Sequence, residues 1–358
     1  MSLRALSRTA VLDPAAVRPR GLPVVWVALA GVIAAEAIGE IVQPSGLGVE
    51  FVFHDWLHDI GGGLAALVCV ARVVGNRHSR AGWAAIAAAL ASFAIGQVLW
   101  SLLYRHQPPQ PNPNVTDVFY LAFYPFAIAG LVLLTRAHVP RFEFHRWVDG
   151  IAIVLIVAAP GVALVFEPVA ARSTGNAFDD AVNFAYPLLD VLLAGAVLGV
   201  FAITNWRPGP CWAWLGAGFL LMAVPDSIAT VQRLHGSSPH LHGPYHLEPY
   251  DFLWTLGMAA IAYAAWMRPR NRIPAERPTG MRAIALPLTA QAIAIAIQVV
   301  SYFHEIPDSA RPLTLAVLLL GMAQIYLARP RRDADEEPAG AVDDVRAAGT
   351  GRHARPGG

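Results

Sequence analysis

The chain has 358 residues, of which 56% are apolar and only 14% are charged. A water-soluble domain rarely has this balance, so most side chains are expected to face lipid or the interior of the protein. The formal net charge of +1 leaves no concentrated basic face of the kind that nucleic-acid binding requires. Composition therefore predicts an integral membrane protein in contact with the lipid bilayer, and no nucleic-acid partner.

Apolar runs long enough to cross a membrane recur along the chain. About 20 helical residues, rising 1.5 Å each, cover the roughly 30 Å core of a bilayer. We therefore predict an all-α, polytopic transmembrane helical bundle of about ten spans. The runs lie at 22–42, 57–75, 82–104, 117–134, 147–166, 180–203, 211–231, 250–267, 283–303 and 312–328.

The two ends of the chain differ in composition from these runs. Residues 1–21 carry several arginines and precede the run 22–42 without a small-residue cleavage site, which favours an uncleaved first span. Residues 331–358 contain almost no large apolar side chain, so we expect a disordered tail. The predicted organisation is a cytoplasmic segment 1–21, a membrane domain 22–330 and a cytoplasmic tail 331–358.

The arginines predict the orientation, because cytoplasmic loops carry an excess of positive charge. With the N-terminus in the cytoplasm, nearly all of the 26 basic residues fall on the inner side. Those that remain outside are Arg105, Arg172, Arg233 and Arg311. This asymmetry predicts an inner-membrane, multi-pass protein with both termini in the cytoplasm.

One short motif occurs twice. Asp117-x6-Tyr124-Pro125 opens the fourth apolar run, and Asp179-x6-Tyr186-Pro187 opens the sixth. Proline removes a backbone donor and favours a kink, so both runs are expected to be kinked helices. The repeat is confined to the beginning of each run.

Acidic residues at the outer starts of the even-numbered spans have two interpretations. A carboxylate there caps free backbone N–H groups and faces the positive end of the helix dipole. The alternative is a binding site on the outer face. The residues concerned are Asp55, Asp117, Asp179 and Asp251.

Three acids lie deeper, at roughly 10 to 15 Å from the outer end of their spans: Glu36, Asp190 and Asp226. A charge at the membrane centre costs at least about 2.5–3.5 kcal/mol, so such acids are candidates for binding a ligand, an ion or a proton. The alternative is a protonated or hydrogen-bonded acid that only fixes helix packing. The side chains expected to pair with them are Tyr124, Tyr186 and Gln97.

Histidines are concentrated in the predicted outer segments. His54 and His58 are four residues apart, and His240, His242 and His246 lie in the longest outer loop. Imidazole binds zinc and copper and titrates near neutrality. Their spacing matches no recurrent ligand signature, so we predict no metal site and treat them as solvated histidines or weak metal candidates.

Motifs of catalysis are absent from the sequence. It contains no Gly-rich phosphate loop, no G-x-S-x-G elbow, no H-E-x-x-H and no kinase motif set. The two cysteines lie in or beside apolar runs and suggest neither a disulfide framework nor zinc binding. We therefore expect neither enzymatic activity nor a cofactor.

Four stretches together resemble the membrane regions of actinobacterial GGDEF and EAL signalling proteins. They are 114–125 (NVTDVFYLAFYP), 185–190 (AYPLLD), 226–228 (DSI) and 251–254 (DFLW). The resemblance extends over roughly 22–330, with Asn114 where serine is usual. It implies an N-terminal sensory or regulatory module that normally precedes a cytoplasmic cyclic-di-GMP domain, and that domain is missing here.

The sequence thus leaves three functions open. The first is a stand-alone sensory module that detects a small apolar or cationic ligand through Glu36, Asp190 and Asp226 and acts on a separate cytoplasmic signalling partner. The second is a small-solute or ion transporter that uses the same acids. The third is a structural subunit of a membrane complex. Neither the ligand nor the oligomeric state follows from the sequence.

Overall fold

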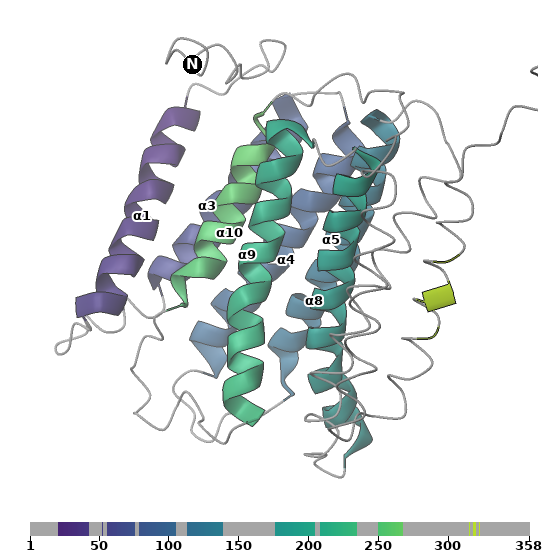
Figure 1. Cartoon of the computed structure of the whole chain (residues 1–358). Helices are drawn as coiled ribbons and strands as arrows, with labels where there is room; N and C mark the ends of the chain where they lie inside the picture. Colours follow the sequence, from purple (N-terminus) through teal and green to yellow (C-terminus); the bar gives the residue numbers. More distant parts are fainter. Residues whose placement is uncertain are drawn as a thin grey trace, which may run out of the picture.

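The computed structural model describes residues 21–42, 52, 56–75, 79–104, 113–138, 176–204, 208–234 and 250–267, and positions 315, 318, 319 and 322. Within these ranges the chain forms seven helices and no β-strand (Figure 1). The helices are α1 (Leu22–Val42), α3 (Leu57–Gly75), α4 (Arg80–Leu103), α5 (Val115–His138), α8 (Ala177–Ile203), α9 (Gly209–Leu234) and α10 (Phe252–Ala264).

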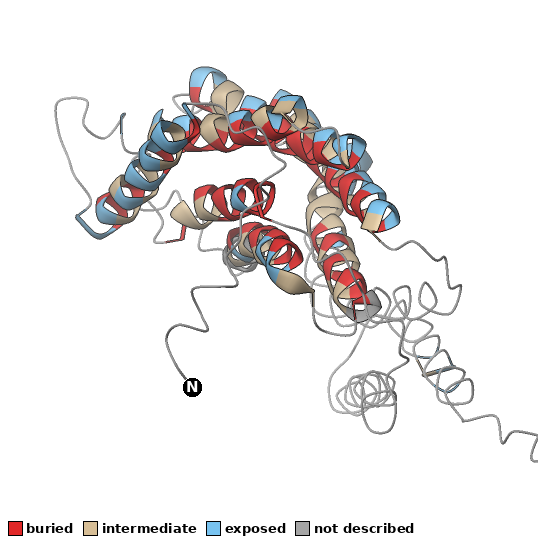
Figure 2. Cartoon of the chain, turned by 90° about the horizontal axis from the view of Figure 1, so that it is seen from above, coloured by how far each residue is buried: buried red, intermediate tan, exposed pale blue. Residues whose placement is uncertain are grey.

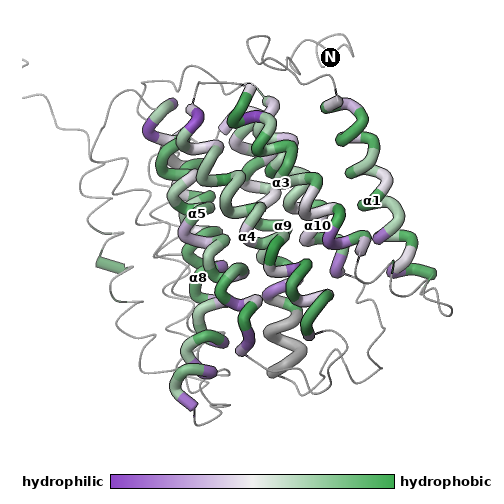
Figure 3. The backbone as a smooth tube through the Cα atoms, turned by 180° about the vertical axis from the view of Figure 1, so that it is seen from behind, coloured by the Kyte–Doolittle hydropathy of each residue, from purple (hydrophilic) through white to green (hydrophobic). Residues whose placement is uncertain are grey.

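Five of these helices are long and apolar enough to cross a membrane, namely α1, α3, α4, α5 and α8. Hydrophobic residues cover most of the helical length and hydrophilic residues gather mainly near helix ends (Figure 3). The all-helical architecture is therefore confirmed for the described residues, and five of their helices are candidates for membrane spans.

The predicted number of about ten spans is not confirmed. The predicted runs 147–166 and 283–303 lie outside the described residues, as do 1–20 and 331–358, and the run 312–328 is described at only four positions. The membrane in which the protein resides and the side on which its termini lie stay predictions.

The described helices form a closed ring with one helix outside it. Going round the ring, α3 packs on α4, α4 on α5, α5 on α8, α8 on α9, α9 on α10, and α10 on α3 again. Helix α1 packs against α3 and α10 from outside. Seen from above, the helices of the outer arc turn buried residues inward and exposed residues outward (Figure 2).

The directions of the helices follow from their contacts. Gly96 near the end of α4 meets Tyr120 near the start of α5, and Gly82 meets Leu134, so these helices are antiparallel. The pairs α5/α8 and α3/α10 are parallel. In the sequence-based prediction both members of each parallel pair are even-numbered spans. The predicted run 147–166 between α5 and α8 lies outside the described residues.

Aromatic side chains fill the interior between opposite sides of the ring. Phe123 of α5 contacts Phe93 of α4 and Phe219 of α9, with ring centroids 5.8 and 6.0 Å apart. All three are buried. The interior of the ring is thus packed with side chains at this level.

Helix α10 is short, and both of its ends are capped by other helices. Its 13 residues cover about 20 Å, less than a bilayer core. At its start, Glu40 of α1 accepts a hydrogen bond from the Phe252 N–H at 2.6 Å. At its end, the Nε of Arg72 on α3 donates to the Ala265 carbonyl oxygen at 2.7 Å. The acid is at the positive end of the helix dipole and the base at the negative end.

Glycines allow α9 and α10 to approach closely. A Cβ atom on Gly218 would lie 2.7 Å from the carbonyl oxygen of Gly257, and one on Gly257 would lie 2.8 Å from the carbonyl oxygen of Gly218. Small residues at helix crossings are typical of membrane bundles, where close packing drives association.

We predict that Gly218→Ala destabilises the protein by about 1–3 kcal/mol, because the new methyl group meets backbone atoms that cannot rotate away. Thermal unfolding of the detergent-purified protein would measure the change. The control is Gly63→Ala on α3, where a Cβ meets no heavy atom within 4 Å, so helix propensity alone acts and stability is kept or raised. Equal stability of both variants would contradict the close α9–α10 crossing.

Candidate functional site

The repeated motifs of α5 and α8 contact each other. The hydroxyl of Tyr124 on α5 donates to Oδ1 of Asp190 on α8 at 2.8 Å, and the hydroxyl of Tyr186 on α8 donates to Oδ1 of Asp117 on α5. We call these four residues the Asp–Tyr cluster. Each motif thus supplies the tyrosine for an acid on the other helix, and this parallel pairing positions Asp190, which is 8% exposed.

Asp117 has a second role at the start of α5. Its Oδ2 accepts the Asn114 N–H at 2.6 Å, and Oδ1 of Asn114 accepts the Thr116 N–H at 2.8 Å. This reciprocal arrangement is a capping box, which satisfies backbone donors that the helix leaves free. Asp117 therefore caps α5, as the sequence predicts, and also accepts the hydrogen bond from Tyr186.

Two of the predicted capping roles fall to other residues. Oδ1 of Asn176 accepts the Phe178 N–H at 3.0 Å and caps α8, while Asp179 lies in the first turn. Asp251 makes no side-chain capping bond, because its own backbone is helical and Glu40 occupies the capping position. The fourth predicted cap, Asp55, lies outside the described residues.

Asp226 of α9 lies beside the Asp–Tyr cluster. It is partly buried and within electrostatic range of Asp190, Tyr124 and Tyr186. Pro225 precedes it and Pro187 precedes Asp190 by one helical turn. Each proline removes a backbone donor and leaves a carbonyl of the preceding turn without its helical partner. Two carboxylates and freed carbonyls therefore lie on adjoining helices.

Gln97 does not pair with an acid, contrary to the sequence expectation. Its side-chain oxygen accepts a hydrogen bond from the hydroxyl of Tyr120, so it links α4 to α5. The hydroxyl of Ser92 adds a second link, donating to the Phe119 carbonyl oxygen at 2.7 Å. These contacts hold the start of α5 against α4 beside the Asp–Tyr cluster.

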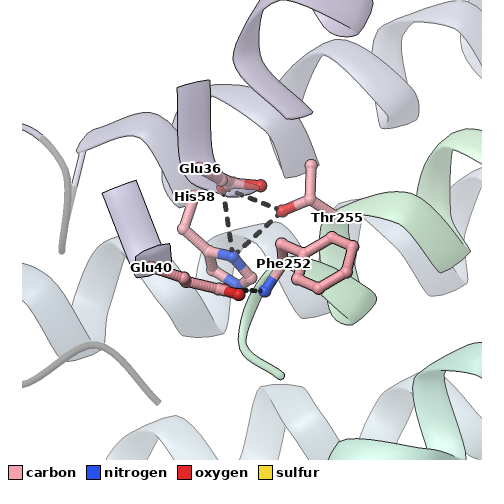
Figure 4. A network of polar contacts seen from close by, with 5 residues as sticks. All are labelled: Glu36, Glu40, His58, Phe252 and Thr255. Carbon is pink, nitrogen blue, oxygen red and sulfur yellow. Dashed lines mark hydrogen bonds and ion pairs between the residues drawn. The ribbon is translucent and has the colours of Figure 1, made fainter. Parts of the chain in front are cut away.

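Glu36 belongs to a different group of residues. Its Oε1 accepts the hydroxyl of Thr255 at 3.0 Å, and the same hydroxyl lies 3.0 Å from Nδ1 of His58 (Figure 4). Nδ1 of His58 is also 3.5 Å from Oε1 of Glu36. We call Glu36, His58 and Thr255 the Glu–His–Thr cluster. It joins α1, α3 and α10, so Glu36 does not share a site with Asp190 as the sequence hypothesis supposed.

The direction of the hydrogen bonds in this cluster depends on which groups carry protons. When Glu36 is ionised and accepts the single proton of the Thr255 hydroxyl, Nδ1 of His58 is the donor to Thr255. Oε2 of Glu36 and Nε2 of His58 are buried and have no hydrogen-bond partner in the described part of the chain. Within the described residues, the cluster thus has one carboxylate oxygen and one ring nitrogen that are not used in hydrogen bonds.

Several buried polar residues were missed by the sequence analysis. Glu40, Asp59, Arg72 and Thr255 are each less than a tenth exposed. Glu40 could have been found from its four-residue spacing after Glu36, which puts both acids on one helical face. Asp59 and Arg72 could have been found because each is a charge inside an apolar run. Nothing local distinguishes Thr255.

The described residues contain no group of three or more His, Cys, Asp or Glu side chains able to hold a metal ion. Of the histidines considered as metal candidates, only His58 lies in the described ranges. His54, His240, His242 and His246 lie outside them.

Comparisons with family models, with curated proteins and with solved structures find no match for this chain.

We predict that Tyr124→Phe lowers the free energy of unfolding by about 1–3 kcal/mol, because it leaves the carboxyl group of Asp190 buried without its hydroxyl donor. Chemical unfolding in detergent would measure the loss, and the double variant Tyr124→Phe/Asp190→Asn would show whether the two changes are coupled. The control is Tyr263→Phe. The hydroxyl of Tyr263 makes no hydrogen bond within the described residues, where only its ring contacts Trp26 and Trp214. Equal losses for the two single variants would contradict the Tyr124–Asp190 bond.

Proposed function

We propose that this integral membrane protein is a sensory or regulatory module in which Asp190 and Asp226 bind a small cationic ligand. The observation that carries the proposal is the placement of these acids on adjoining helices, with a tyrosine hydroxyl as the hydrogen-bond partner of Asp190. Arginine is not among the partners of Asp190 in the described residues. A bound cation would therefore supply Asp190 with a full positive charge, which none of its described partners does.

The energetics of the membrane interior support this choice. Two carboxylates close together in a medium of low dielectric constant repel each other, and each costs free energy to bury. A bound cation relieves both costs, and freed carbonyl oxygens near Pro187 and Pro225 are further ligands of the kind that discontinuous membrane helices provide. Binding would draw α8 and α9 together.

The response is proposed to pass to a separate cytoplasmic partner. The resemblance to membrane regions of GGDEF and EAL proteins supports this proposal, because such regions normally precede an output domain. The polar tail 331–358 is the segment that we propose as the contact. A two-state sensor requires a ligand that binds one conformation more tightly than the other. A ligand that binds best when α8 and α9 are close together meets this requirement.

A transporter is the second candidate, and the contact of Tyr186 in the second Asp-x6-Tyr-Pro motif with Asp117 in the first favours it. Transporters are often built from repeats that meet at the substrate site. The observation fits a same-direction repeat, because α5 and α8 are parallel. Solute flux distinguishes the candidates, since a sensor binds its ligand without moving it across the membrane.

We predict that a cation bound at this site raises the thermal stability of the wild-type protein and leaves Asp190→Asn unchanged. At a concentration of 100 times the dissociation constant, the expected stabilisation is about 2.7 kcal/mol. The measurement is a thermal-shift series with sodium, primary amines and tetramethylammonium on the detergent-purified protein. The control is Asp179→Asn, the same substitution in the first turn of the same helix, which should respond like the wild type.

Flux into proteoliposomes completes the test. Uptake of the stabilising cation that depends on Asp190 would replace the sensory proposal with the transporter. If no cation changes the thermal stability of Asp179→Asn and Asp190→Asn differently, both the sensor and the transporter are ruled out. A structural subunit then becomes the better description.

A further inference from the structure

We propose that His58 is a proton-binding site and that its protonation holds the outer end of α1 against the helix ring. This inference does not depend on the cation site between α8 and α9. It comes from the Glu–His–Thr cluster, in which an imidazole on α3 lies between an acid on α1 and a hydroxyl on α10 (Figure 4).

The geometry joins three helices through one ring nitrogen. Nδ1 of His58 is 3.0 Å from the Thr255 hydroxyl and 3.5 Å from Oε1 of Glu36. Its ring also lies against Trp254 of α10, with centroids 5.9 Å apart in an edge-to-face arrangement. When the His58 ring takes up a proton, Nδ1 keeps both Thr255 and Glu36 as neighbours. The contact with Glu36 then becomes an ion pair, which is strong in the low-dielectric interior of the protein.

The charges around His58 are otherwise all negative in the described residues. Glu36 and Glu40 face it from α1, Asp59 is its neighbour on α3, and Asp251 approaches from the start of α10. The fourth helix nearby, α4, carries its only charge at Arg80, its first residue and the end remote from this cluster. An imidazolium at this position therefore lies among negative charges, with Glu36 in direct contact.

Helix α1 is the element free to respond. It lies outside the ring, and among the described helices its substantial interfaces are those with α3 and α10. In the apolar 18-residue stretch of α1, 22% of the residues are buried, against 44% in the corresponding stretch of α3. At its outer end the contacts with α10 are polar, through Glu36 to Thr255 and Glu40 to the Phe252 N–H, whereas nearer its start Trp26 packs on Tyr263.

Loss of the proton therefore has a definite consequence. A neutral imidazole no longer forms an ion pair with Glu36. Because Glu36 belongs to α1, this helix is then held less tightly against α3 and α10. Histidine is the side chain whose charge changes most readily near neutral pH, so a comparison of acidic and basic pH tests this step.

Distance measurements between two spin labels test the proposal on the full chain in nanodiscs. The labels are placed at Ile41→Cys on α1 and Leu102→Cys on α4, both strongly exposed positions. The native thiols Cys69 and Cys211 are buried, and labelling of the wild type measures their background. We expect a narrow distance distribution at pH 5.5 and a longer or clearly broader one at pH 8.5.

His58→Gln should remove this pH dependence, because the neutral amide still hydrogen-bonds but cannot take up the proton. The matched control is His138→Gln, the same substitution at the last residue of α5, which should keep the response of the wild type. A third variant, Glu36→Gln, should also lose the response while keeping an acceptor for Thr255.

A label pair at Leu102→Cys and Val118→Cys, on α4 and α5, shows whether each variant retains the folded ring. The proposal is overturned if the wild-type distribution is the same at both pH values. It is equally overturned if His58→Gln, with an intact ring, keeps the wild-type response.

Discussion

The structure depends on satisfying the backbone groups at the two ends of α10. A helix leaves its first N–H groups and last carbonyl groups without partners, and each costs free energy when it is buried. With only 13 residues, α10 covers about 20 Å, less than a bilayer core. Glu40 of α1 and Arg72 of α3 solve this problem with charges that also match the helix dipole. Helices α1 and α3 are thus required to cap the two ends of α10.

The same requirement explains why polar residues concentrate at one end of α10. Glu40 binds the backbone of Phe252, and one helical turn earlier Glu36 reaches Thr255 together with His58. Close crossing at Gly218 and Gly257 keeps α10 against α9 over the rest of its length. Helix α10 is therefore closely packed on the ring side, whereas the last turns of α1 are joined to it by hydrogen bonds from polar groups.

The Asp–Tyr cluster follows a different physical rule. Its acids are paired with hydroxyl donors, which stabilise a carboxyl group without supplying a full opposite charge. Buried carboxylates that lack a cationic partner are expensive in a membrane, and they persist where binding of a proton or cation offsets the cost. The cluster lies between α5, α8 and α9, and the Glu–His–Thr cluster lies between α1, α3 and α10. The two thus lie at different helix junctions.

Sequence alone predicted a helical membrane protein and the positions of the seven helices that the structure describes, because apolar length is a local property of the chain. It also named Tyr124 as a possible partner of a buried acid, and Asp117 as a cap from its place at the start of an apolar run. It could not show that Glu36 pairs with His58, that Glu40 rather than Asp251 caps α10, or that Gln97 binds Tyr120. Those pairings join residues distant in the chain, and only the packing of the helices decided which polar groups would meet where water cannot satisfy them.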